Sequence, residues 1–155
     1  MCIRDSNNST GLPNAILNLG DNTVLCSTLT AGAKISIGQL NGTYYSSVGP
    51  AVNGQAGPTW VIGGKQTATT TNTFAGSILA DNSYSWSTLA GTTSLIKLGA
   101  GTQILSGQNT YQGSTTISNG TLILAEPGAM GDNFGGTNSV YSGSITCLLY
   151  TSRCV

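Results

Sequence analysis

The chain has 155 residues, with 22 Gly, 6% charged residues, no His and a formal net charge of zero, whereas ordinary domains carry about 25% charged residues. This composition excludes a nucleic-acid binder, which needs clustered Lys and Arg to neutralise phosphates, and the absence of His excludes a Ser-His-Asp triad. No apolar run approaches the ~20 residues of a membrane-spanning helix, so we expect no membrane insertion by this segment.

The first and last residues differ in origin from the rest of the chain. The DNA string AGATGTGTATAAGAGACAG encodes residues 1–6 from its ATG, its reverse complement encodes residues 147–152, and a second reading frame encodes residues 153–155 before a stop. This resembles a sequencing adapter translated at both ends of a gene fragment. We therefore interpret residues 1–6 and 147–155 as adapter-derived and residues 7–146 as the native segment.

Setting the adapter residues aside changes the cysteine and charge counts. Of the 4 cysteines only Cys26 remains, which leaves no pair for a disulfide framework and no metal-binding Cys cluster. Its apolar neighbours in "TVLCSTL" favour a small core residue over a reactive thiol. The remaining three Lys and four Asp and Glu give a net charge of −1.

Short runs of aliphatic and β-branched residues recur along the chain, each of strand length and each followed by Gly, Asn or Asp. No window has apolar residues spaced by three and four over the ten or more residues that a helix needs. The sequence therefore predicts an all-β fold. The runs lie at residues 15–20, 33–40, 58–64, 73–80, 83–89, 94–99, 102–107, 114–118 and 121–125.

Turn residues and an internal repeat indicate the kind of β fold. Asn-Gly pairs at 41–42, 53–54 and 119–120 tolerate positive φ, so the chain can turn sharply there. The segment "NTFAGSI" at 72–78 has the same pattern as "NTYQGST" at 109–115, at an offset of 37 residues. Repeats spaced by about 20 to 50 residues are typical of solenoids, propellers and arrays.

One stretch carries a more specific pattern. Residues 97–124 read "KLGAGTQILSGQNTYQGSTTISNGTLIL" and resemble the autotransporter-associated β-strand repeat, approximately K-x-G-x-G-T-L-x-L-x-G-x-N-x-Y-x-G-x-T-x-I-x-x-G-x-L. Gln103 departs from this pattern, which prefers an apolar residue there, and Ile104 is the alternative inward residue. The matching positions are Lys97, Gly99, Gly101, Thr102, Leu105, Gly107, Asn109, Tyr111, Gly113, Thr115, Ile117, Gly120 and Leu122.

The resemblance implies a fold and an origin. Proteins with this repeat are exported bacterial surface proteins whose passenger regions resemble right-handed parallel β-helices. We therefore expect a right-handed parallel β-helix, a β-solenoid of about six coils of ~20 to 25 residues. Because adapter-derived residues stand at both ends, we expect this solenoid to be incomplete and without native caps. Thr115 and Ile117 would share one strand face, as would Leu122 and Leu124, so that stacked coils build aliphatic ladders.

The polar repeat residues have expected places in this fold. Gly107, Gly113 and Gly120 would mark corners, with the amide of Asn109 hydrogen-bonding stacked backbone. Lys97 would be a solvated charge that discourages pairing at a strand edge.

Candidate catalytic and metal-binding residues are few. Glycoside hydrolysis needs two carboxylates about 5 to 9.5 Å apart, and the native acids are Asp21, Asp81, Glu126 and Asp132. The last two flank the loop "PGAMG", where carboxylates are usually solvated. "AMGDNFGG" lacks the Gly and Asp order of the calcium nonapeptide repeat. We therefore expect no enzyme, no catalytic residue, no cofactor and no metal.

Aromatic residues offer a candidate sugar-binding surface. Tyr84 and Trp86 alternate in "SYSWS" and would share a strand face, where they could stack on sugar rings together with Tyr44, Tyr45 or Trp60. The alternative, which we favour, is that these rings fill the core.

We expect a structural or adhesive segment of an exported bacterial surface protein, similar to an autotransporter passenger stalk, on the extracellular or outer-membrane surface. Its expected partners are host or matrix glycans, surface proteins and, through open coil ends, other copies of itself. The alternative function is a carbohydrate-binding or polysaccharide-cleaving β-helix.

Overall fold

The computed structural model describes residues 2–4, 11–29, 32–50, 57–80, 93–125, 144–148 and 153–154. Within these residues every regular element is a β-strand, which confirms the all-β prediction. None of them forms a helix that is long and apolar enough to span a membrane. The strands are β1 (Cys2–Arg4), β2 (Gly11–Leu19), β3 (Val24–Ser27), β4 (Lys34–Gly42), β5 (Ser47–Pro50), β6 (Thr59–Ile62), β7 (Thr71–Phe74), β8 (Ser77–Ile78), β9 (Ser94–Lys97), β10 (Thr102–Leu105), β11 (Thr115–Ile117), β12 (Thr121–Leu124), β13 (Ile145–Cys147) and β14 (Arg153–Cys154).

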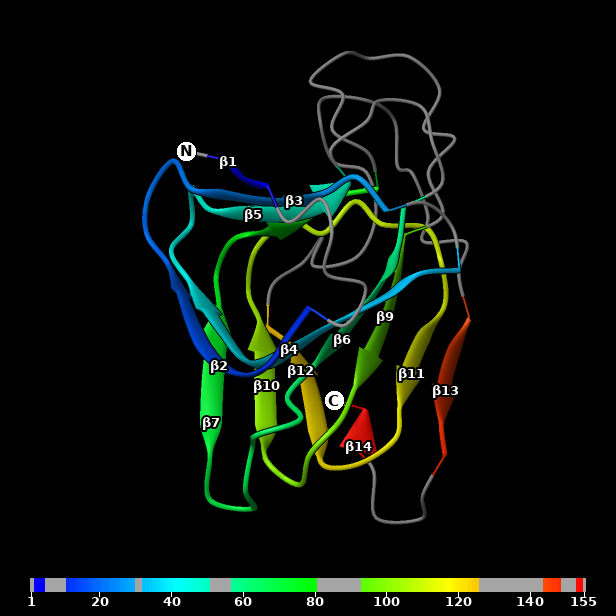
Figure 1. The fold of residues 1–155 in the computed structure, drawn as a ribbon. Helices are drawn as coiled ribbons and strands as arrows, with labels where there is room; N and C mark the ends of the chain where they lie inside the picture. The colour runs from blue at the N-terminus through cyan, green and yellow to red at the C-terminus, as the bar shows by residue number, and fades with distance from the viewer. Residues whose placement is uncertain are drawn as a thin grey trace.

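All described strand pairs are parallel, and no strand pairs with its immediate neighbour along the chain. A 4-stranded sheet has the order β1-β3-β5-β8, and a 10-stranded sheet curls opposite it (Figure 1). Parallel pairing requires a crossover between partners, which here is provided by strands in the other rows. The arrangement is consistent with a β-solenoid.

The long strand β4 joins two rows of the larger sheet. Its first part, Lys34–Ile37, pairs with β6, whereas Gly42 at its end pairs with β7. We call β2-β4-β6-β9-β11-β13 the first row and β2-β4-β7-β10-β12-β14 the second row. The first three coils pass through the larger sheet and then the smaller sheet, as in the order β6, β7 and β8, whereas the next two coils contribute β9 and β10, then β11 and β12, to the first and second rows. We call the turn from first row to second row the first corner.

Coil length varies along the chain. From β2 to β4, paired residues are 25 positions apart before a register shift and 23 after it. The spacing is 25 from β4 to β6, 35 from β6 to β9 and 20 from β9 to β11. The expectation of uniform coils of ~20 to 25 residues is therefore wrong. The sequence similarity between residues 72–78 and 109–115, at an offset of 37, does not mark the structural repeat either. Asn72 pairs with Gln103 and not with Asn109.

Inward side chains stack into ladders, because in-register parallel strands place equivalent residues above one another. In the smaller sheet Leu25, Val48 and Ile78 occupy successive levels, and each is at most 4% exposed. In the second row Phe74 and Leu105 stack in the same way and are fully buried. Full burial of such a side chain contributes about 1.5–3 kcal/mol, so the ladders hold successive coils together.

The outermost strands expose apolar side chains at both ends of the stack. Leu12 and Ile16 on β2 are 40% and 60% exposed, and Ile145 and Leu148, on and just after β13, are 48% and 61% exposed. β1 and β14 lie at sheet edges and consist of residues interpreted as adapter-derived. On that interpretation, peptides foreign to the fold have added to its edges, as unpaired strand edges permit.

Candidate functional site

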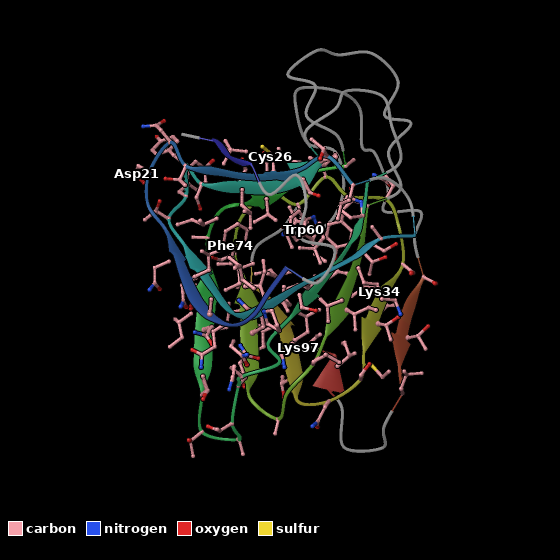
Figure 2. All side chains as sticks on the ribbon, viewed as in Figure 1. Asp21, Cys26, Lys34, Trp60, Phe74 and Lys97 are labelled. Atoms are coloured by element: carbon pink, nitrogen blue, oxygen red, sulfur yellow. The ribbon has the colours of Figure 1, made fainter. Side chains whose placement is uncertain are left out.

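The repeat residues meet in the fourth and fifth coils, where Lys97 is fully buried. Along β9 buried and half-buried residues alternate, and this phase turns Lys97 inward. It stacks between Ile62 and Ile117 in the first row, and Figure 2 shows it inside the curl of the sheets. The expectation of a solvated edge charge is therefore wrong.

The Lys97 ammonium is held by backbone carbonyls at the first corner. Nζ donates to the oxygens of Leu98 and Gly99, the latter at 2.8 Å, and lies 3.4 Å from the oxygen of Asn119 in the next coil. Desolvation by burial lowers the pKa of Lys97 from its ordinary value of 10.5 to about 8. The group therefore fastens two consecutive corners together as a cation at neutral pH.

Glycines allow these corners to approach so closely. Gly63, Gly99 and Gly120 all have positive φ, at 86°, 71° and 71°. A Cβ on Gly99 would lie 2.0 Å from the oxygen of Gly63, and one on Gly101 would lie 2.5 Å from the oxygen of Thr67. Any side chain at these two positions would force the stacked corners apart.

A polar network lies beside the corner within the second row. The Nε2 atom of Gln66 donates to Asn72 Oδ1 at 2.8 Å and to Gln103 Oε1 at 3.2 Å. Gln103 is fully buried and donates to the oxygen of Leu40 at 3.1 Å. Because Gln103 occupies the inward position and Ile104 is only half-buried, the alternative in which Ile104 turns inward is wrong.

Further repeat residues link the second row to the smaller sheet. Asn109 is fully buried, and its Oδ1 accepts from the Ile78 backbone N–H at 2.9 Å while its Nδ2 donates to the oxygen of Gly107 at 3.0 Å. The Asn109 amide thus hydrogen-bonds stacked backbone, as the sequence suggested. The hydroxyl of buried Tyr111 lies 2.9 Å from Thr115 Oγ1.

The two remaining corner glycines are also tightly enclosed. A Cβ on Gly107 would lie 2.1 Å from the oxygen of Gly76, and one on Gly113 would lie 2.3 Å from Ser94 Oγ. Together with buried Leu105, Ile117 and Leu122, these contacts give the repeat residues a role in packing one coil against the next.

The candidate aromatic residues divide between core and surface. Trp60 is 1% exposed and belongs to the core (Figure 2), so it cannot take part in a surface platform. Tyr44 and Tyr45 are 65% and 66% exposed, and their rings form an edge-to-face pair with centroids 5.1 Å apart. Tyr84 and Trp86 lie outside the described residues.

The candidate acids give no assembled site in the described part of the chain. Asp21 is exposed on the turn before β3, whereas Asp81, Glu126 and Asp132 lie outside the described residues. Among the residues that the structure describes, no three His, Cys, Asp or Glu side chains are grouped to hold a metal ion.

Cys26 differs from its prediction in one respect. It is 2% exposed, as expected for a core residue, but it is disulfide-bonded. The expectation that it has no disulfide partner is therefore wrong. Since the other cysteines of the chain are Cys2, Cys147 and Cys154, the bond joins Cys26 to a residue that we interpret as adapter-derived.

Sequence reasoning missed the roles of Gln66 and Asn72. Both are buried and bonded to each other, but no local pattern distinguishes them from solvated turn residues. The one available signal was Gln103, a polar residue at a position where the repeat pattern prefers an apolar one, because a buried amide requires polar partners.

Comparison with known proteins gives one family. Residues 95–124 match the family model of the passenger-associated-transport-repeat. The matched range begins within β9 and ends with β12, so it covers the Lys97 corner and the Asn109 contacts. A search of curated proteins and a search of solved structures gave no match. Residues 95–124 are thus an autotransporter passenger repeat, a family that implies an exported surface protein.

Proposed function

We propose that the chain is a structural segment of the passenger of an exported bacterial surface protein, which spaces or displays an adhesive region outside the cell and is not an enzyme. The observation that carries this proposal is the coincidence of the passenger repeat with the corner contacts of Lys97 and the Asn109 bonds. Lys97 and Asn109, which belong to the repeat pattern, form contacts that join one coil to the next. Such residues build a rod that can be extended by further coils.

We further propose that the rod is a right-handed parallel β-helix. Parallel strands joined through a crossover are right-handed in about 98% of cases, because a right-twisted strand packs back onto its sheet only in that way. The parallel rows described above fall under this rule.

A binding and turnover assay tests the structural function. We expect the purified chain to show no cleavage and no saturable binding on a panel of polygalacturonates, glucans and host glycans, because its repeat residues are used within the fold. Products would be followed by reducing-end release and binding by calorimetry. Cleavage that is lost in Glu126→Gln would instead establish a polysaccharide-cleaving enzyme.

A carbohydrate-binding function is the second candidate, favoured by the exposed Tyr44 and Tyr45 pair. Exposed tyrosine rings can stack on the apolar face of a sugar at little conformational cost. Saturable glycan binding that is lost in the Tyr44→Ala, Tyr45→Ala double variant would support it. Loss in Trp86→Ala instead would place the platform on the other candidate aromatics.

Self-association through the coil ends is an additional proposal. The two ends of the stack expose apolar side chains on β2 and near β13, and each end presents a strand edge to which another parallel strand can add. Addition of the β2 end of one copy to the β13 end of another joins two different surfaces, so it is a heterologous, head-to-tail contact that can continue into an open filament. The native net charge of −1 provides little repulsion.

We expect the chain to form elongated oligomers or aggregates whose size increases with concentration in light scattering. Deleting both adapter-derived segments alone should leave this behaviour unchanged, whereas fusing a polar capping coil to each end should give monomers. A monomer at high concentration in the uncapped chain would contradict the open-ended fold.

A further inference from the structure

The peptide bond between Asn119 and Gly120 has polar contacts on both sides. Its N–H, on Gly120, donates to the side-chain oxygen Oδ1 of Asn119 at 2.8 Å. Its carbonyl oxygen, on Asn119, lies 3.4 Å from the Lys97 ammonium. The Gly120 nitrogen therefore lies close to the side-chain amide of Asn119, whose carbon Cγ is bonded to Oδ1. Gly120 has no Cβ that would hinder the approach of its nitrogen to Cγ.

We propose that Asn119 and Gly120 form a self-modification site at which the asparagine amide is converted to an acid, and that Lys97 accelerates the conversion. The Gly120 nitrogen loses its proton to solvent base and attacks Asn119 Cγ. The bond from Cγ to the side-chain nitrogen breaks, and ammonia leaves with a proton from solvent. The product is a five-membered succinimide. Water then adds to one of its two carbonyls and opens the ring to aspartate or isoaspartate.

Lys97 favours the slow first step through the peptide group that reacts. Amide nitrogen is a poor nucleophile until its proton is removed, and the negative charge that then develops is shared with the carbonyl oxygen of the same peptide. A cation held near that oxygen in a largely desolvated corner stabilises this charge more than it would in water. The carbonyls of Leu98 and Gly99 hold the ammonium in place.

No acidic residue lies on the described elements that surround Lys97 at this corner. The described elements around it are β6 and β11 with their corners, and β14 beside β12; their charged residues are Lys65 and Arg153, the latter in register with Thr121. Lys65 belongs to the preceding coil, and its Cγ approaches Gly38 of the coil before that. It therefore lies on the side of the stack away from Asn119.

The pair Asn41 and Gly42 serves as an internal control, because the same dipeptide has different surroundings there. It lies within β4, in register with the strands on either side. Asn41 Oδ1 accepts from the Thr73 backbone N–H at 3.2 Å and from Asn72 Nδ2 at 2.9 Å, and its Nδ2 donates to Asn18. The Asn41 amide is thus held by neighbouring coils, and no Lys contacts its peptide among the contacts described.

The modification would change how the fifth coil joins the fourth. Aspartate at position 119 would place a carboxylate next to the Lys97 corner. Isoaspartate would also add a methylene to the backbone between β11 and β12, where the Thr121 N–H bonds the oxygen of Gly101 at 3.1 Å. The fraction of converted Asn119 would therefore increase with time after synthesis, at the contact between the fourth and fifth coils.

The test is peptide mass spectrometry of the full chain incubated in the folded state at neutral pH, with separation of aspartate from isoaspartate. We expect Asn119 to be converted about tenfold faster than Asn41, as a barrier lower by about 1.4 kcal/mol would give. In denaturant the two sites should convert at similar rates. Equal rates in the folded chain, or an unchanged ratio on unfolding, would overturn the proposal.

The role of Lys97 is tested with Lys97→Met. This variant should slow conversion at Asn119 several-fold while leaving Asn41 unchanged. The rate of Asn119 conversion in the unaltered chain, divided by the rate in Lys97→Met, should fall above pH 8, where the Lys97 ammonium loses its proton. A constant ratio across this range, or equal rates at neutral pH, would show that Lys97 does not act on the reaction. If the variant does not fold, the dependence of the Asn119 to Asn41 rate ratio on pH in the unaltered chain decides the same point.

Discussion

Leu105→Asp is expected to destabilise the chain by about 3–5 kcal/mol, whereas Ile104→Asp should cost less than about 1 kcal/mol. Leu105 is fully buried and stacks between Phe74 and Leu124 in the second row. A carboxylate there would lose its hydration within an aliphatic ladder. Ile104 is half-buried on the opposite strand face, where an acid keeps contact with water.

Urea unfolding of the two variants and the unaltered chain measures this difference. The comparison tests strand register directly, since a one-residue slip exchanges the two faces. If Ile104→Asp proved the more damaging change, Gln103 would have to face solvent and the polar network around Gln66 would not exist. Leu105→Met, which conserves volume, should remain within about 1.5 kcal/mol of the unaltered chain.

The strands could be predicted from the sequence because their pattern is local. Runs such as 94–97 and 102–105 have the length and punctuation of strands, and both are strands in the structure. The parallel solenoid arrangement came from the repeat pattern at 97–124. The coil lengths could not be predicted, because loops between rows add residues without changing the strands, so that 35 positions separate β6 from β9.

The inward polar residues show a second limit of prediction. Alternation along β9 and β10 places Lys97 and Gln103 inward, whereas their side-chain chemistry argues for solvent. The outcome depends on partners contributed by other coils, namely the carbonyl of Asn119 for Lys97 and Gln66 for Gln103. Such partners become visible only when the stacking of the coils is known, because a buried polar group is tolerated only where it is bonded.

The buried Lys97 should also make stability depend on pH in an unusual direction. The folded pKa of Lys97 is about 8, below its ordinary value of 10.5. Below pH 8 both the folded and the unfolded chain hold this proton, so Lys97 contributes no slope. Between pH 8 and 10.5 the unfolded chain holds the proton and the folded chain releases it. The free energy of unfolding should therefore rise with pH in this window.

The free energy of unfolding should rise by about 3 kcal/mol, because each pH unit between the two pKa values contributes about 1.4 kcal/mol. Urea unfolding at several pH values measures this rise. Lys97→Met is the matched control, because it keeps a long side chain between Ile62 and Ile117 and has no proton to release. All other ionisable groups are the same in both proteins, so the difference between the two pH profiles reports Lys97 alone. Identical pH profiles for the two proteins would mean that Lys97 is solvated, and the carbonyl-held corner would then have to be abandoned as the link between the fourth and fifth coils.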